Sequence, residues 1–184
     1  MTKKRLSFLF ILFSCFVLFA GPFNINMGDS EQDLIDKKIN FTVYSETDSE
    51  KIIDFIPNEQ DNVFDDYFLY LDKQSGVYSV TEISKLISCS SGGKELYQVY
   101  NLLSTILDKA FETSSKSYVF QSSSINSEEK TMENLLSEDL VVLNYWKVDN
   151  LNNDIKSITL EMRAETEDMG FLVLNYYGYD ILDY

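Results

Sequence analysis

The sequence predicts an α+β protein in which an antiparallel sheet is covered on one face by a long amphipathic helix and by shorter helices. Three observations carry this prediction. Apolar residues recur at helical spacing from Lys94 to Glu112, short segments before this stretch alternate between apolar and polar residues, and three strand-like segments end the chain. We therefore expect the N-terminal strands and a C-terminal three-strand meander to share one sheet, with the helix packed against it.

The chain opens with the pattern of an export signal. Residues 3–5 are basic, and an uncharged apolar run follows over residues 6–20, which is short for a membrane span. We expect cleavage near Gly21, and hence a secreted, periplasmic or cell-envelope protein. Two alternatives stay open. The segment is retained as a membrane anchor, or Cys15 is lipidated within Leu12-Phe13-Ser14-Cys15, a loose lipobox.

Three regions are expected along the chain: an export signal over residues 1–20, a polar leader over 21–38 and a single α+β domain over 39–184. The signal contains three of the 15 basic residues and none of the 30 acidic residues. The remainder therefore carries 12 basic and 30 acidic residues, a net charge of −18. Nucleic-acid binding needs a basic surface, so this charge argues against it. An acidic surface also attracts cationic partners.

The N-terminal part of the domain reads as strands. Ile39–Ser45 alternates between apolar and polar residues, and Lys51–Ile56 is a second short strand before Pro57. Tyr67–Leu71 and Val77–Val80 form a predicted hairpin, because Gly76 provides the backbone freedom that the turn requires.

Helices are expected next. Ser79 followed by Glu82 has the spacing of a capping box, which predicts a helix from about Val80. The glycine-containing loop Ser88–Gly93 then leads into the long helix. It lacks the first glycine and the hydroxyl residue after Lys94 that a Walker A loop needs, so it is interpreted as a helix connector.

The last third returns to strands. Tyr118–Phe120 is a short strand, and residues 127–137 form a small helix. Three segments then make up the meander, and the middle one has the clearest alternation in the chain. These segments are Leu140–Val148, Ile158–Ala164 and Phe171–Tyr177.

No metal or cofactor site is predicted. Four residues match oxygen-ligand positions of an EF-hand loop, but Ile155 occupies the position where that loop needs glycine. The four are Asn150, Asn152, Asp154 and Glu161. Cys89 would be the only cysteine left after removal of the signal, so no intrachain disulfide is expected. We expect Cys89 to be a small apolar residue near the end of a helix, with a free or a dimer-forming thiol as the alternatives.

Catalytic motifs are also lacking. The chain has no histidine, which excludes serine and cysteine triads that use one. We therefore expect a non-enzymatic protein that binds a protein or small ligand through Tyr176, Tyr177 and Tyr179; the acidic surface favours a cationic partner. The alternative is a hydrolase of carbohydrate or peptide that uses two carboxylates.

Overall fold

The computed structural model describes residues 22–58, 62–112, 115–122, 130–148 and 154–183. The predicted export segment and Cys15 lie outside the described residues, as do Asn150 and Asn152. Among the described helices, none is long and apolar enough to cross a lipid bilayer.

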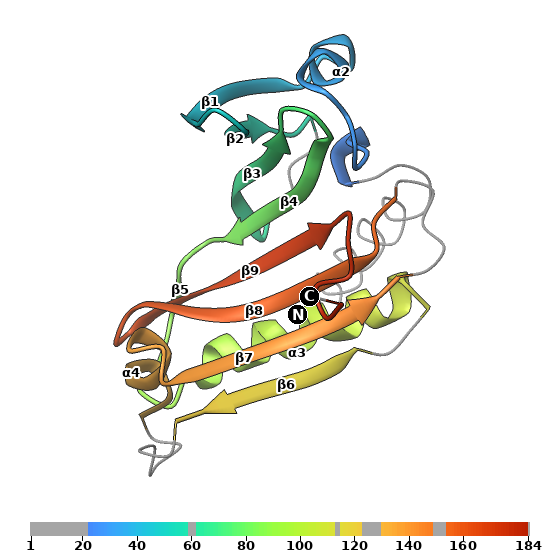
Figure 1. The fold of residues 1–184 in the computed structure, drawn as a ribbon. Helices are drawn as coiled ribbons and strands as arrows, with labels where there is room; N and C mark the ends of the chain where they lie inside the picture. The colour runs from blue at the N-terminus through green and yellow to red at the C-terminus, as the bar shows by residue number, and fades with distance from the viewer. Residues whose placement is uncertain (1–21, 59–61, 113–114, 123–129, 149–153, 184) are drawn as a thin grey trace, which may run out of the picture.

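The protein is built on one antiparallel sheet of nine strands (Figure 1). The strands are β1 (Asn40–Glu46), β2 (Glu50–Ile56), β3 (Phe64–Asp72), β4 (Gly76–Ser84), β5 (Ile87–Ser88), β6 (Lys116–Gln121), β7 (Leu140–Lys147), β8 (Ser157–Thr166) and β9 (Met169–Tyr177). Their order across the sheet is β1-β2-β3-β4-β9-β8-β7-β6, and β5 pairs separately with β9. Two meanders are therefore joined where β4 pairs with β9.

Four helical segments of the described chain accompany the sheet. They are η1 (Pro22–Asn24), α2 (Glu31–Asp36), α3 (Lys94–Ala110) and α4 (Thr131–Leu136). α3 packs mainly on β5, β8 and β9, and α4 packs on β7 and β8. The predicted fold class, a sheet covered by a long amphipathic helix, is wrong. Strands make up 47% and helices 22% of a mixed α/β fold that is mostly sheet, and no long amphipathic helix covers this sheet.

The β3–β4 hairpin shows how local sequence sets the N-terminal meander. Gly76 has a φ of 89°, and Asp72 closes the turn by accepting hydrogen bonds from Gln74 N at 2.9 Å and Ser75 N at 2.7 Å. The predicted hairpin is confirmed, but the predicted helix near Val80 is wrong. Residues 76–84 form β4, because residues 79–83 pair with β3 on one side and with β9 on the other.

The C-terminal meander agrees with the sequence prediction. β7, β8 and β9 pair in register over most of their lengths, with one shift between Ala164 and Thr166. β7 carries Trp146, which is fully buried. The apolar residues on both faces of Leu140–Val148 predict a central strand, whereas β7 lies next to the edge strand β6.

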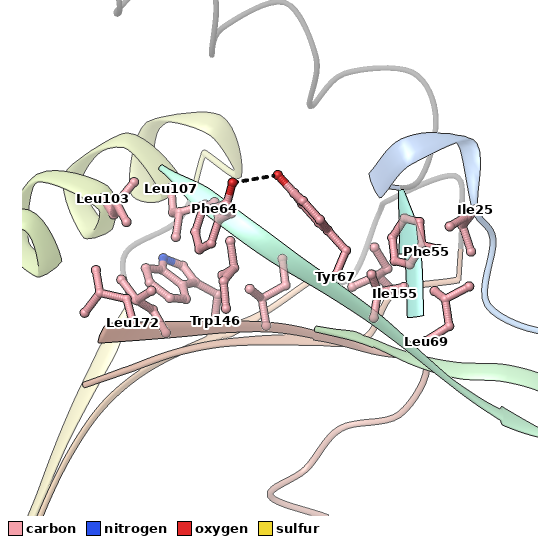
Figure 2. Packing of buried hydrophobic residues seen from close by; sticks show 14 of the residues in the cluster. Ile25, Phe55, Phe64, Tyr67, Leu69, Leu103, Leu107, Trp146, Ile155 and Leu172 are labelled. Carbon is pink, nitrogen blue, oxygen red and sulfur yellow. Dashed lines mark hydrogen bonds between the residues drawn. The ribbon is translucent and has the colours of Figure 1, made fainter. Parts of the chain in front are cut away.

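The core fills the space between one face of the sheet and the helices (Figure 2). Near α3, Leu103 and Leu107 face Trp146. Near the N-terminal meander, Phe55 and Tyr67 lie 5.8 Å apart by ring centroids. Tyr67 donates its hydroxyl proton to the Phe64 carbonyl at 3.2 Å, which satisfies a polar group inside this apolar layer.

The leader predicted over residues 21–38 also contributes to this core. Ile25 and Leu34 have no exposed surface. α2 begins at a capping box, in which the Ser30 side chain accepts from Asp33 N and the Asp33 side chain accepts from Ser30 N.

The two edges of the sheet differ. β1 forms one edge and contains a bulge between Val43 and Ser45, where its register with β2 shifts. β6 forms the other edge and pairs with β7 over six successive residues without a shift. A bulge bends an edge strand and disturbs its outward backbone groups, whereas a regular edge leaves them aligned.

Candidate binding surface

The sheet has one face against the helices and one without them. Asn144 Nδ2 donates to Ser104 Oγ of α3 at 2.7 Å, so the even-numbered residues of β7 face this helix. Residues directly opposite in an antiparallel pair share a face. The register therefore assigns the paired strand residues from β2 to β9 to one side or the other. No helix of the described chain lies on the second side, which we call the helix-free face.

The centre of the helix-free face is a row of small polar residues across three strands. Thr81, Asn175 and Thr159 are register partners on β4, β9 and β8. Thr81 Oγ1 donates to Asn175 Oδ1 at 2.6 Å, and Asn175 Nδ2 donates to Thr159 Oγ1 at 3.2 Å. These bonds satisfy polar groups that are almost fully buried, since Thr81 is 6% exposed and Thr159 is 2% exposed.

Aromatic residues border this row on the N-terminal meander. Phe68 is the register partner of Thr81, and Tyr70 is the partner of Ser79. Tyr44, at the β1 bulge, is 72% exposed and meets Phe68 edge-on, with ring centroids 5.9 Å apart. Tyr70 and Tyr78 are 6.2 Å apart. Four aromatic rings therefore lie on one side of the first four strands.

Acidic residues lie among these rings. Asp54 is exposed opposite Phe68, and Asp66 is exposed two residues before it on the same strand face. Glu50 accepts a hydrogen bond from the Tyr78 hydroxyl at 3.2 Å. Burial, followed by this bond, raises the pKa of Tyr78 to about 12.

No basic side chain of the first four strands shares this surface. Lys51 is the only basic residue in β1–β4. It points to the opposite face, where it contacts Glu31 of α2 at 2.5 Å. Asp54 and Asp66 form no ion pair with any residue in the described part of the chain. We call this surface the aromatic–acidic patch; it consists of Tyr44, Phe68, Tyr70, Tyr78, Glu50, Asp54 and Asp66.

The three tyrosines predicted from the sequence do not share one surface. Tyr176 pairs with Val80 and Ile158 and packs against the core, on the helix side. Tyr177 lies on the helix-free face, with its ring 5.4 Å from that of Tyr179. All three side chains are partly exposed. Only Tyr177 and Tyr179 can therefore extend the patch.

The end of the chain folds back over the helix-free face beside the patch. Asp180 accepts hydrogen bonds from the Tyr145 hydroxyl and from Lys147 Nζ, both at 2.6 Å. Ser157 Oγ donates to the Tyr179 carbonyl at 2.7 Å. The bond from Lys147, and then that from Tyr145, lowers the pKa of Asp180 to about 2. This anchoring fixes Tyr179 next to Tyr177.

Two surface hollows lie away from the patch. One, of about 480 Å³, lies between α2 and the β3–β4 turn. Its charged groups are already paired, because Lys51 contacts Glu31 at 2.5 Å and Lys73 contacts Glu46 at 2.6 Å. The other, of about 700 Å³, lies beside Cys89, and its lining includes Glu133 of α4 and three acidic residues at the end of β8 and in the β8–β9 turn.

Groups with reactive chemistry are few in the described residues. Burial raises the pKa of Cys89, which keeps the thiol protonated and unreactive. Burial also raises the pKa of the Glu161 carboxyl, although Arg163 Nε contacts it at 2.9 Å. The described part of the chain contains no cluster of three His, Cys, Asp or Glu residues suited to a metal ion.

Comparison with protein-family models, curated proteins and solved structures gives no significant match. The interpretation of the surface therefore depends on its own chemistry. Most of the patch was missed from the sequence, because Phe68 and Tyr70 alternate with Tyr67, Leu69 and Leu71, so both strand faces look equally apolar. The available signal was the concentration of acidic residues, seven against one lysine, within the segments that became β1–β4.

Proposed function

We propose that the protein is a non-enzymatic binding protein of the cell envelope or the extracellular space, which holds a lysine- or arginine-rich protein segment on the aromatic–acidic patch. One observation carries this proposal: the exposed ring of Tyr44, three half-buried aromatic rings and carboxylates without ion pairs in the described chain share a sheet face that no described helix covers. Exported location is supported by the basic and apolar pattern of residues 1–20.

The chemistry of the patch fits a cationic segment in two ways. Aromatic rings bind ammonium and guanidinium groups through their negatively polarised faces, and Tyr44 presents a largely free ring. Carboxylates without intramolecular ion pairs are available to pair with the same cations. The overall net charge of −15 steers a positively charged partner toward the protein.

A synthetic decapeptide of alternating lysine and serine is the probe that tests this proposal, with its affinity measured by titration calorimetry in about 0.1 M salt. The double variant Asp54→Asn/Asp66→Asn should weaken binding by about 10-fold or more, because charge-assisted contacts contribute about 1.5–3 kcal/mol each when formed. Tyr44→Ala should also weaken binding, by a factor of about 2–5, as expected for loss of an exposed cation–π contact.

The control variant removes the same number of negative charges from a surface away from the patch. Glu165, near the end of β8, and Glu167, in the β8–β9 turn, are both exposed. Glu165→Gln/Glu167→Gln should leave the affinity within a factor of about two, because long-range charge is screened beyond about 10 Å in 0.1 M salt. If both double variants weaken binding equally, the patch is not the site. Absence of measurable peptide binding to the wild type would also reject the proposal.

A further inference from the structure

We infer that β6 is a self-association edge, through which two copies of this chain pair their sheets antiparallel about a two-fold axis at Val119. This surface is separate from the aromatic–acidic patch, which lies at the other end of the sheet (Figure 1). The inference rests on the backbone register of β6, its side chains and its charge.

The backbone bonds of β6 show which groups are free. Ser122 N donates to Asp139 O at 2.9 Å. This pair continues the register in which Gln121 faces Leu140. Hydrogen-bonded pairs alternate along an antiparallel ladder, so Tyr118 and Phe120 also bond to β7. Three residues therefore turn their N–H and C=O groups outward, away from the sheet: Ser117, Val119 and Gln121.

These outward groups are symmetric about Val119. When the Val119 residues of two copies lie opposite each other, Ser117 of each copy faces Gln121 of the other copy. Each of the three facing pairs exchanges two backbone hydrogen bonds. The same register continues both sheets with their helix-free faces on one side, because residues of equal parity meet.

The side chains of β6 fit this arrangement. Val119 is 61% exposed and Phe120 is 60% exposed. In the two-fold register, Tyr118 of each copy lies opposite Phe120 of the other copy. Both of these pairs occupy the closely spaced, non-hydrogen-bonded positions of the ladder. The two rings already stack within one chain, with an interplanar angle of 4° and centroids 6.2 Å apart. Pairing therefore creates a row of four aromatic rings across the joint.

Charge favours a second copy at this edge rather than elsewhere on the molecule. β6 contains Lys116 and no acidic residue, in a chain with a net charge of −15. Repulsion between two copies is therefore weakest where these strands meet. The remaining long-range repulsion is screened by salt, so the dimer should tighten as salt rises. Binding of a cationic peptide at the patch should weaken under the same change, which distinguishes the two sites.

Cysteine crosslinking tests the register directly, in the full chain with Cys15→Ser and Cys89→Ser. Val119→Cys places two thiols opposite each other, about 5.5 Å apart at their Cα atoms, which a disulfide can span. It should form a crosslinked dimer under mild oxidation. Ser117→Cys is the matched control, because its symmetry mate lies about 13 Å away along the strand. Equal crosslinking of both, or none at position 119, would overturn the inference.

Sedimentation velocity over a concentration and salt series measures the association itself. Val119→Pro should weaken it about 10- to 100-fold, because proline removes an intermolecular donor in each copy and blocks close approach. The outward N–H of Val119 has no bond to β7, so an edge proline leaves the folded chain intact. Val119→Thr, which keeps the N–H, should associate as the wild type does. A wild-type protein that stays monomeric throughout, or a folded Val119→Pro protein that still dimerises, would reject the two-fold edge.

Discussion

Trp146 Nε1 donates a hydrogen bond to Asp108 Oδ1 at 2.8 Å, and this bond attaches the last turns of α3 to the C-terminal end of β7. Asp108 Oδ1 also accepts from Ser115 N at 2.9 Å, which holds the chain as it leaves the helix toward β6. One turn earlier, Asn144 and Ser104 form the second polar contact between the same two elements. The helix is thus positioned by directional bonds as well as by apolar packing.

Asp108→Ala should destabilise the fold by about 1–3 kcal/mol, because the indole N–H of a fully buried tryptophan would lose its acceptor. Asp108→Asn keeps an acceptor oxygen and should cost less. Trp146 is the only tryptophan, so urea unfolding followed by fluorescence measures both variants at the site of the change. Equal losses for Ala and Asn would show that the bond itself contributes little.

The buried side of α3 should dominate its contribution to stability. Leu103 is 3% exposed, and Leu103→Ala should lower the free energy of unfolding by about 2–5 kcal/mol. Asn101 is exposed on the other side of the same helix, so Asn101→Ala should change it by less than about 0.5 kcal/mol. Comparable urea midpoints for the two variants would contradict this orientation.

The Asp180 contact should give the folded protein an acid-dependent contribution. Its pKa is lowered from 3.8 to about 2 by Lys147 and Tyr145, so the ionised form stabilises the fold. This contribution is complete above the unfolded-state pKa and is lost as the pH falls through about 2. The stability difference between the wild type and Asp180→Asn should therefore be constant above about pH 5 and shrink between about pH 4 and 2. Thermal melts across this range measure it; a constant difference down to pH 2 would exclude Asp180 as the cause.

The β3–β4 turn should not accept a side chain at position 76. Gly76 has a φ of 89°, and a methyl group there would collide with the Gly28 carbonyl. Gly76→Ala should therefore cost more than about 1 kcal/mol. Gln74→Ala, in the same turn but with an exposed side chain, should stay within about 0.5 kcal/mol of the wild type. Thermal melts of the two variants measure this difference. Similar midpoints would show that the turn rearranges.

Cleavage of the N-terminal segment is expected near Gly21, from the basic and apolar pattern of residues 1–20. N-terminal sequencing and intact-mass measurement of the protein recovered from both the membrane and the membrane-free exported fractions test this prediction. An intact Met1, or an added lipid mass on Cys15, would support the anchor or the lipoprotein alternative instead.

Strands were the most predictable part of this fold. Alternation over Ile158–Ala164 and the glycine at position 76 each describe a local backbone choice, and both predictions are confirmed. Ser79 and Glu82 were misread because the capping-box spacing is also compatible with a strand. The pairing of β4 with β9, about 90 residues away, decided between the two.

The prediction that a long helix covers the sheet is wrong for a geometric reason. An eight-strand path is about 34 Å wide at about 4.8 Å per strand, whereas a helix with its side chains is about 10–12 Å across. The α3 segment was correctly placed, but one such helix cannot cover this sheet. Sequence periodicity gives the buried side of a helix and contains no information about sheet width. The same limit applies to the patch, because Phe68 and Tyr67 look alike until the core selects one face.

The bulge beside Tyr44 has a consequence for polymerisation. A sheet with two regular edges could add copies at both ends and grow into a fibre of unlimited length. Here the β1 register shifts between Val43 and Ser45, so that edge offers no continuous template for another strand. Growth through β6 would therefore terminate after a single addition, with both irregular edges outermost.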